Sequence, residues 1–205
     1  MSLKAVIFDL DGVLADACSV HREALNQALR EVANYEIPED ELSKFEGLPT
    51  KNKLLILSNE GNVAHDLHDE VNRRKQELTH EMLKGHIIYS TPLNHMMWNI
   101  QRNGLKIAVV TNCTAHSARM MLEQLGVSKY IDLMVTPEQV KHPKPDPEGL
   151  LLAMRVMGVD PDEVIYVGDQ PVDAAAAHRA GIEAYVNVQG TSEVSWELLR
   201  RRIEE

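Results

Sequence analysis

The sequence of 205 residues contains few aromatic residues and few cysteines. Aromatic side chains make up 4% of it, so a hydrophobic core has to consist mainly of Leu, Val, Ile, Ala and Met. The two cysteines, Cys18 and Cys113, are too few for a disulfide-stabilised scaffold, and we expect both to be reduced thiols. The 44% of hydrophobic and 25% of charged residues are ordinary for a globular protein with one domain, or with one core and a modest insertion.

Basic residues are fewer than acidic ones, with 21 Lys and Arg compared with 31 Asp and Glu. The formal net charge of −10 disfavours nucleic acids and anionic membranes as partners, because both bind basic surfaces. No apolar run reaches about 18 residues, so no membrane span is expected, and no signal peptide is visible. We expect a cytoplasmic protein, either a monomer or a weak homodimer. A small anionic substrate would require a local cationic pocket.

The spacing of apolar residues divides the chain, which has no internal repeat and no low-complexity linker. Residues 4–8 predict a buried strand, whereas residues 15–88 have helical spacing and no strand pattern. The expected helices of this insert are 17–34 with Asp16 as N-cap, 39–45, 51–57 with Thr50 as cap, and 63–83.

Helices and strands alternate after the insert. This alternation predicts an α/β, Rossmann-like three-layer core, in which helices cover both faces of a central parallel sheet. We predict a core of residues 1–14 and 89–205, with the helical insert at 15–88. The further strands are expected at 105–110, 131–135, 164–167 and 182–186, and the helices at 93–102, 115–125, 147–157, 172–180 and 192–203.

Polar side chains follow several of the predicted strands. Because the carboxyl ends of parallel strands meet at one edge of a sheet, we expect these side chains to converge there. Gly12, directly after the first strand, allows a sharp turn with amide groups close to an anion. The other candidates are Asp9, Asp11, Thr111, Asn112, Lys144, Asp169 and Asp173.

These residue types together suit phosphoryl chemistry. Asp9 and Asp169 can hold a hard divalent cation, and Mg²⁺ is favoured over Zn²⁺ because no His or Cys cluster accompanies them. Thr111, Lys144 and the amides near Gly12 can bind a phosphate. Asp9 can attack phosphorus to form an aspartyl-phosphate, while a second acid, Asp11, protonates the leaving oxygen and later deprotonates water.

Each candidate also has a purely structural interpretation. Thr111 could cap the following helix, and Lys144 could be a surface lysine in a proline-rich loop. Asp169 and Asp173 could be the N-cap and first-turn acids of helix 172–180. Their occurrence in order, each at a strand end, favours a shared site.

Four motifs make the chain similar to the haloacid dehalogenase-like hydrolase superfamily, namely residues 9–13, 109–112, 144–147 and 168–173. The insert resembles the helical cap of its phosphoglycolate phosphatase and β-phosphoglucomutase branch. This resemblance implies Asp9 as nucleophile, Asp11 as acid and base, and Thr111 and Lys144 as phosphate-binding residues. It also implies Mg²⁺ on Asp9, the Asp11 carbonyl and Asp169, with Asp173 either as a further ligand or just outside the ligands.

Within this superfamily, residue identities favour a phosphatase. Haloacid dehalogenases and phosphonoacetaldehyde hydrolases lack the acid found here as Asp11, and β-phosphoglucomutases usually have Glu where this chain has Gly168. Two features depart from the usual pattern: Ala17 replaces a Ser or Thr, and Gln170–Pro171 follows Asp169.

Three residues of the insert are candidate substrate contacts by their position relative to related caps: His21, Thr50 and Lys51. The alternative for Lys51 is a solvated helix residue and for His21 a surface histidine, and for both residues this alternative is favoured over a substrate contact. We expect His65, His68 and the basic run 73–75 to be solvated, with a His65/His68 metal pair as the alternative.

The sequence therefore predicts a Mg²⁺-dependent phosphatase acting on a small phosphorylated metabolite such as a sugar phosphate or phosphoglycolate. A phosphomutase or phosphotransferase of the β-phosphoglucomutase type is the first alternative. A catalytically inactive protein that binds a phosphorylated ligand or a partner is the second.

Overall fold

The computed structural model describes residues 3–204, and the chain divides into two compact units. One unit combines Met1–Asp16 with Ile87–Glu205, and the other is Ala17–His86. No helix among the described residues is long and apolar enough to cross a membrane.

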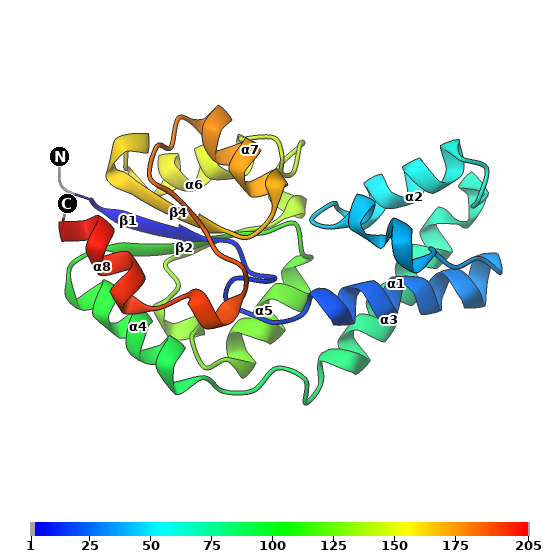
Figure 1. Cartoon of the computed structure of the whole chain (residues 1–205), viewed down its shortest axis with the longest axis horizontal. Helices are drawn as coiled ribbons and strands as arrows, with labels where there is room; N and C mark the ends of the chain where they lie inside the picture. The colour runs from blue at the N-terminus through cyan, green and yellow to red at the C-terminus, as the bar shows by residue number, and fades with distance from the viewer. Residues whose placement is uncertain (1–2, 205) are drawn as a thin grey trace. The chain divides into compact units, whose positions relative to one another are not determined.

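A five-stranded parallel sheet forms the centre of the first unit (Figure 1). Its strand order is β3-β2-β1-β4-β5, so β1 lies in the middle between β2 and β4. All residues of β1 are buried, as expected for a short apolar strand covered on both faces. The strands are β1 (Ala5–Phe8), β2 (Lys106–Val110), β3 (Leu133–Val135), β4 (Val164–Gly168) and β5 (Tyr185–Asn187).

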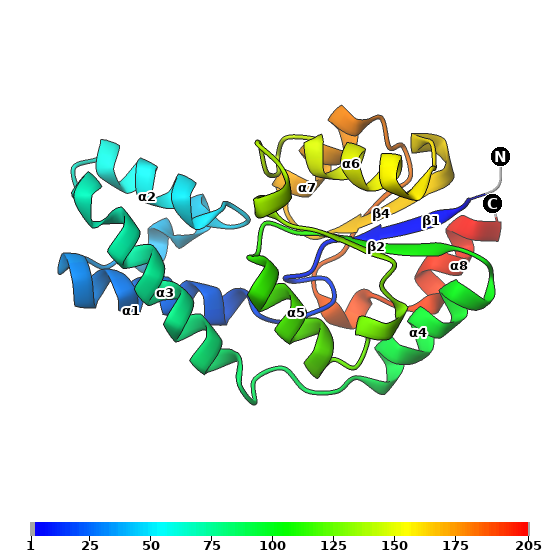
Figure 2. The ribbon, with the colours of Figure 1, turned by 180° about the vertical axis from the view of Figure 1, so that it is seen from behind.

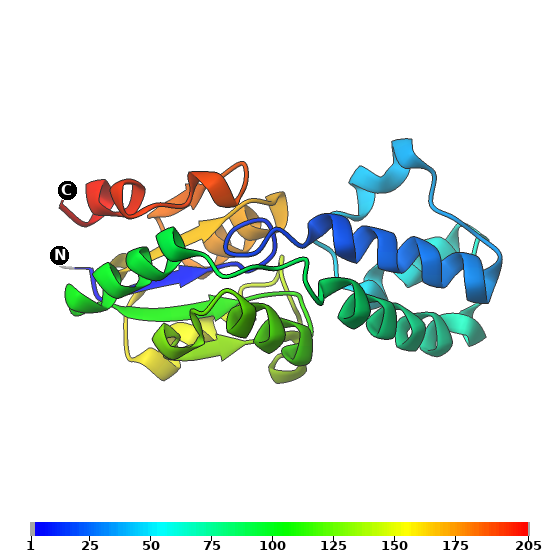
Figure 3. The ribbon, with the colours of Figure 1, turned by 90° about the horizontal axis from the view of Figure 1, so that it is seen from below.

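Helices cover both faces of this sheet, which confirms the predicted three-layer α/β core. Figures 1 and 3 show α4 (Thr91–Arg102), α5 (Ala115–Gln124) and α8 (Trp196–Glu204) on one face. The opposite face carries α6 (Glu148–Met157) and α7 (Pro171–Ala180). Aliphatic side chains from α6 and α7 form one core cluster with those of β1, β2 and β4, and their burial supplies the main stabilising free energy.

The second unit is entirely helical. Figures 1 and 2 show α1 (Cys18–Ala33) and α3 (His68–Leu83) side by side and antiparallel. They share an apolar core with α2 (Thr50–Asn59) and the 3₁₀ segment Glu39–Phe45.

Three predicted helix starts in this unit are wrong. Ala17 rather than Asp16 precedes α1, and no side chain caps that helix. Thr50 is the first residue of α2 rather than its cap, because Pro49 occupies the N-cap position. The predicted helix 63–83 becomes regular only at His68, after the 3₁₀ turn His65–Leu67. Cap residues act only where the backbone is extended before the first turn, and residue type alone does not establish that geometry.

Candidate active site

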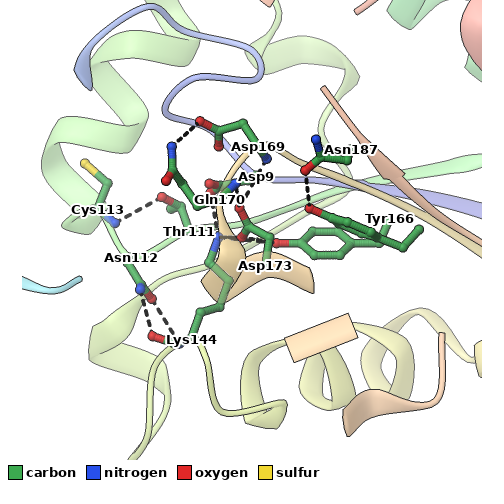
Figure 4. A network of polar contacts seen from close by, with 11 residues as sticks. Asp9, Thr111, Asn112, Cys113, Lys144, Tyr166, Asp169, Gln170, Asp173 and Asn187 are labelled. Carbon is green, nitrogen blue, oxygen red and sulfur yellow. Dashed lines mark hydrogen bonds and ion pairs between the residues drawn. The ribbon is translucent and has the colours of Figure 1, made fainter. Parts of the chain in front are cut away.

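Five predicted residues come together at the carboxyl edge of the sheet (Figure 4). We call Asp9, Thr111, Lys144, Asp169 and Asp173 the sheet-edge cluster. Asp9 follows β1 directly, and its N–H donates to the carbonyl of Val167 at 2.9 Å. This hydrogen bond continues the pairing of β1 with β4, so the backbone that carries the Asp9 carboxylate is held in the sheet.

Lys144 lies at the centre of the cluster and is 3% exposed. Its Nζ is 2.7 Å from Oδ1 of Asp9 and 2.6 Å from Oδ1 of Asp173. Figure 4 shows the ammonium group directed at both carboxylates. The interpretation of Lys144 as a surface lysine is therefore wrong, since its charge is buried and shared between two acids.

The charges in this group are unequal, with two carboxylates against one ammonium. Burial opposes the charged form of Lys144, but Asp9 and Asp173 outweigh it and raise the pKa of Lys144. Burial likewise opposes charge on Asp173, yet Lys144 and the hydrogen bonds to its carboxylate lower the pKa of Asp173. For Asp9, burial dominates and raises its pKa well above the ordinary value. Of the two carboxylates, Asp9 is therefore the one whose negative charge the surrounding protein groups do not fully compensate.

Asn112 holds the loop that carries Lys144. Its Nδ2 donates to the Lys144 carbonyl at 2.9 Å, and its Oδ1 accepts the Lys144 N–H at 3.1 Å. This reciprocal pair connects the end of β2 to the loop before α6. We predicted Asn112 as a substrate contact, and the structure gives its side chain these two backbone hydrogen bonds.

Thr111 is 4% exposed and begins the turn after β2. Its N–H donates to the Val135 carbonyl at 3.1 Å, and its Oγ1 accepts the N–H of Cys113 at 3.0 Å. Thr114, not Thr111, caps α5 by accepting from Ser117. The interpretation of Thr111 as a helix cap is therefore wrong.

Asp173 is completely buried, and both of its oxygens accept hydrogen bonds. Oδ1 accepts from the Tyr166 hydroxyl at 2.6 Å as well as from Lys144. Oδ2 accepts the backbone N–H of Gln170 at 3.0 Å, so Asp173 is also the first-turn acid of α7. The structural interpretation of Asp173 thus holds alongside its contact with Lys144.

Tyr166 is a member of this network that our interpretation of the sequence missed. It lies in β4, is fully buried, and its hydroxyl is 3.3 Å from Nζ of Lys144. A tyrosine in a strand buried on both faces needs a hydrogen-bond partner for its hydroxyl group. Its place in the predicted strand 164–167 could therefore have indicated that Tyr166 contacts the polar residues at the sheet edge.

Asp169 presents one oxygen that no protein group satisfies. Within residues 3–204, its Oδ1 is buried without a hydrogen-bond partner, whereas Oδ2 accepts from Nε2 of Gln170 at 2.8 Å. Burial raises the pKa of Asp169 above its ordinary value. A buried carboxylate oxygen of this kind is costly unless a cation or a proton compensates it.

Asp9, Asp169 and Asp173 offer carboxylate oxygens that lie within 4.8 Å of one another. Oxygen-only donors suit hard divalent cations, and the unsatisfied Oδ1 of Asp169 is consistent with such an ion. The cluster therefore fits a divalent metal.

In the loop after β1, several backbone N–H groups donate to the same carbonyl group. The Leu10 carbonyl accepts the N–H groups of Leu14 and Ala15, both at 2.9 Å, and the Gly12 N–H donates to Ala15. The amide of Gly12 itself is thus used within the loop, rather than left for a phosphate. Asp11, in the same loop, is partly exposed.

Gly12 has a φ of +82°, and a Cβ there would lie 2.2 Å from Oδ2 of Asp169. We expect Gly12→Ala to lower the free energy of unfolding by about 2–4 kcal/mol, through the left-handed backbone and the clash. Urea denaturation measures this loss. Gly104→Ala is the matched control, because Gly104 has a φ of +76° but nothing within 4 Å. Equal losses in both variants would show that contact with Asp169 adds nothing.

The remaining candidates belong to the helical unit. Thr50 is half-buried and Lys51 is exposed. Nδ1 of His21 lies 3.3 Å from Nζ of Lys75. Lys75, which we expected to be solvated, is 7% exposed, because it shares one face of α3 with Val71 and Leu78. His68 accepts or donates a hydrogen bond with Ser58 through Nε2 at 2.5 Å.

The fold and the sheet-edge cluster define an α/β enzyme with a carboxylate site at the ends of its strands. Within that class, the chain belongs to the haloacid dehalogenase-like hydrolases, whose family model matches residues 6–186. The four-motif resemblance is thereby confirmed.

Relatives and solved structures agree with this assignment. The chain is 31% identical over 191 residues to a phosphorylated carbohydrates phosphatase of Thermotoga maritima, covering 91% of this chain and 85% of that protein. It is 27% identical over 206 residues to pyrophosphatase PpaX of Oceanobacillus iheyensis, covering 97% and 86%. A β-phosphoglucomutase of Clostridium difficile shares the fold, with a TM-score of 0.83 at 18% identity over 98% and 97% of the two chains. The chain is therefore a hydrolase of the phosphatase type within this family.

Proposed function

We propose that this protein is a Mg²⁺-dependent phosphatase that cleaves a small phosphorylated metabolite, such as a sugar phosphate or phosphoglycolate, through an aspartyl-phosphate. The observation that carries the proposal is the buried Lys144, which lies between Asp9 and Asp173, two acids whose carboxylate oxygens lie within 4.8 Å of one of Asp169. The Lys144 ammonium, together with a cation held by the neighbouring acids, would bind a phosphate that the net charge of −10 would otherwise repel.

Asp9 is the nucleophile in this proposal. Its carboxylate attacks phosphorus while the oxygen of the leaving group takes a proton from Asp11. Asp11 then removes a proton from water, which hydrolyses the aspartyl-phosphate and releases inorganic phosphate. Proton transfer by a positioned carboxyl group contributes on the order of 10²–10⁴ in rate.

Lys144 and Thr111 bind the phosphoryl oxygens in this proposal. The Lys144 ammonium compensates negative charge on the phosphate and keeps the Asp9 carboxylate in place. Asn112 contributes by holding the Lys144 loop through its two backbone hydrogen bonds.

The cation would be held by Asp9, the Asp11 carbonyl and Asp169, whose Oδ1 has no partner among the described residues. A bound Mg²⁺ would offset the repulsion between phosphate and carboxylates. Asp173 accepts four hydrogen bonds from the protein, and we assign it the role of orienting Lys144, just outside the ligands.

We further infer that the core comprises residues 1–14 and 89–205 and that residues 15–88 act as a cap that selects the substrate. His21, Thr50 and Lys51 are the substrate contacts we propose within it. The relatives named as carbohydrate-phosphate phosphatase and pyrophosphatase support a small phosphorylated substrate.

Phosphate release from a panel of sugar phosphates, phosphoglycolate and pyrophosphate, each with Mg²⁺ and with EDTA, tests the proposal. We expect turnover of at least one monoester in Mg²⁺ and its loss in EDTA, with recovery when Mg²⁺ is restored. A panel without any released phosphate would contradict the proposal.

The same panel separates the alternatives. An isomerised sugar phosphate without released phosphate would identify a mutase of the β-phosphoglucomutase type. Binding of phosphorylated ligands without any turnover would identify a non-catalytic protein.

A further inference from the structure

The side chain of Gln170 contacts the carboxylate of Asp169. Its Nε2 donates to Oδ2 of Asp169 at 2.8 Å. Gln170 occupies the N-cap position of α7, where its backbone carbonyl accepts the N–H of Asp173 at 2.9 Å and its own N–H donates to Oδ2 of Asp173 at 3.0 Å. The start of the helix therefore fixes the backbone of Gln170, and the amide group of its side chain fixes one oxygen of Asp169.

The same Asp169 oxygen is also enclosed from the side of Gly12. A Cβ on Gly12 would lie 2.2 Å from Oδ2, so the Gly12 backbone passes directly beside it. The other oxygen, Oδ1, is buried and has no hydrogen-bond partner among residues 3–204. The two oxygens of the Asp169 carboxylate thus differ: Oδ2 accepts a hydrogen bond from Gln170, and Oδ1 has no hydrogen-bond partner among the described residues.

We propose that Gln170 is a positioning residue that makes Asp169 bind a cation through Oδ1 alone and thereby favours Mg²⁺ over Ca²⁺. This inference rests on the divalent-cation site of the proposed function. It concerns which residue makes the site prefer Mg²⁺ to Ca²⁺, which the proposed function does not explain.

Coordination chemistry supplies the reason. Mg²⁺ is small and requires six oxygens in a nearly ideal octahedron, so it suits one oxygen from each carboxylate. Ca²⁺ accepts six to eight oxygens and readily takes both oxygens of one carboxylate. Nε2 of Gln170 and the Gly12 backbone lie against Oδ2, so a cation cannot bind both oxygens of Asp169 at once.

Isothermal titration of the metal-free protein with MgCl₂ and, separately, with CaCl₂ measures the preference without reference to activity. In Gln170→Ala we expect the ratio of the Ca²⁺ dissociation constant to that of Mg²⁺ to fall about tenfold, a size typical of changes next to metal ligands. Gln170→Ser separates the amide contact from any effect on the start of α7, since Ser suits an N-cap position but is too short to replace the Gln170 amide. We expect the same fall in the ratio with Ser.

The outcomes are distinguishable. A ratio that is unchanged in both variants overturns the inference and leaves the proposed function intact. A fall with Ala but not with Ser also overturns it, because a weakened start of α7 would then be the cause. If the unaltered protein binds neither ion, the inference and the metal requirement of the proposed function both fail. Circular dichroism establishes that each variant is folded, and the Ser variant serves if the Ala variant is not.

Discussion

Asp9→Asn should lower kcat for phosphate release by about 10⁴-fold or more, because the amide is no nucleophile and the covalent step is lost. Substrate affinity should change far less, since Lys144 and Thr111 remain. Steady-state kinetics with the best substrate of the panel, and a search for phosphate covalently bound to the protein, measure both effects. A variant that keeps a tenth of the activity would rule out Asp9 as the nucleophile.

The same substitution should leave stability unchanged or increase it. Asp9 is buried, and its pKa is raised because burial disfavours its charge. Removing that charge leaves Lys144 with Asp173 as a balanced pair, so the variant should unfold at the same or a higher temperature at pH 7. Asp162→Asn is the matched control, because Asp162 is exposed beside the amino end of β4 and should affect neither property.

Lys144→Met should have the largest effect on stability. It leaves the carboxylates of Asp9 and Asp173 buried without the ammonium that lies 2.7 and 2.6 Å from them. Removing one partner of a buried ion pair typically costs about 3–5 kcal/mol, and we expect a loss of this size at pH 8. Urea denaturation in EDTA measures it, with Lys141→Met, an exposed lysine of the same loop, as control.

The loss in Lys144→Met should depend on pH. Without the ammonium, the pKa values of Asp9 and Asp173 rise, so the folded variant binds more protons than the unfolded chain between their unfolded and folded pKa values. Stability in that interval rises as the pH falls. The deficit should therefore be smaller at pH 5 than at pH 8. An equal deficit at both values would indicate lost packing of the lysine side chain rather than uncompensated charge.

The local pattern of residues was sufficient to predict the α/β core and the acids at its edge. Strands such as β1 and β4 are short runs of buried apolar residues, and the alternation of such runs with helices permits few arrangements other than a parallel sheet. Once the sheet is parallel, residues that follow its strands must meet at one edge, as Asp9, Thr111 and Asp169 do. These features depend on spacing within the chain, which the sequence displays directly.

The partners of each side chain depended on the tertiary structure. Three contacts show this: Tyr166 donates to Asp173, Asn112 holds the Lys144 loop, and Lys75 is buried beside His21. Each of them joins residues of two different helices, strands or loops. A residue type shows which hydrogen bonds a side chain can form, but the packing of separate elements decides which donor comes within reach of which acceptor. The sequence by itself therefore determined the fold and the acids at its edge. Only the tertiary structure decided how those acids are paired, because pairing depends on distances in space.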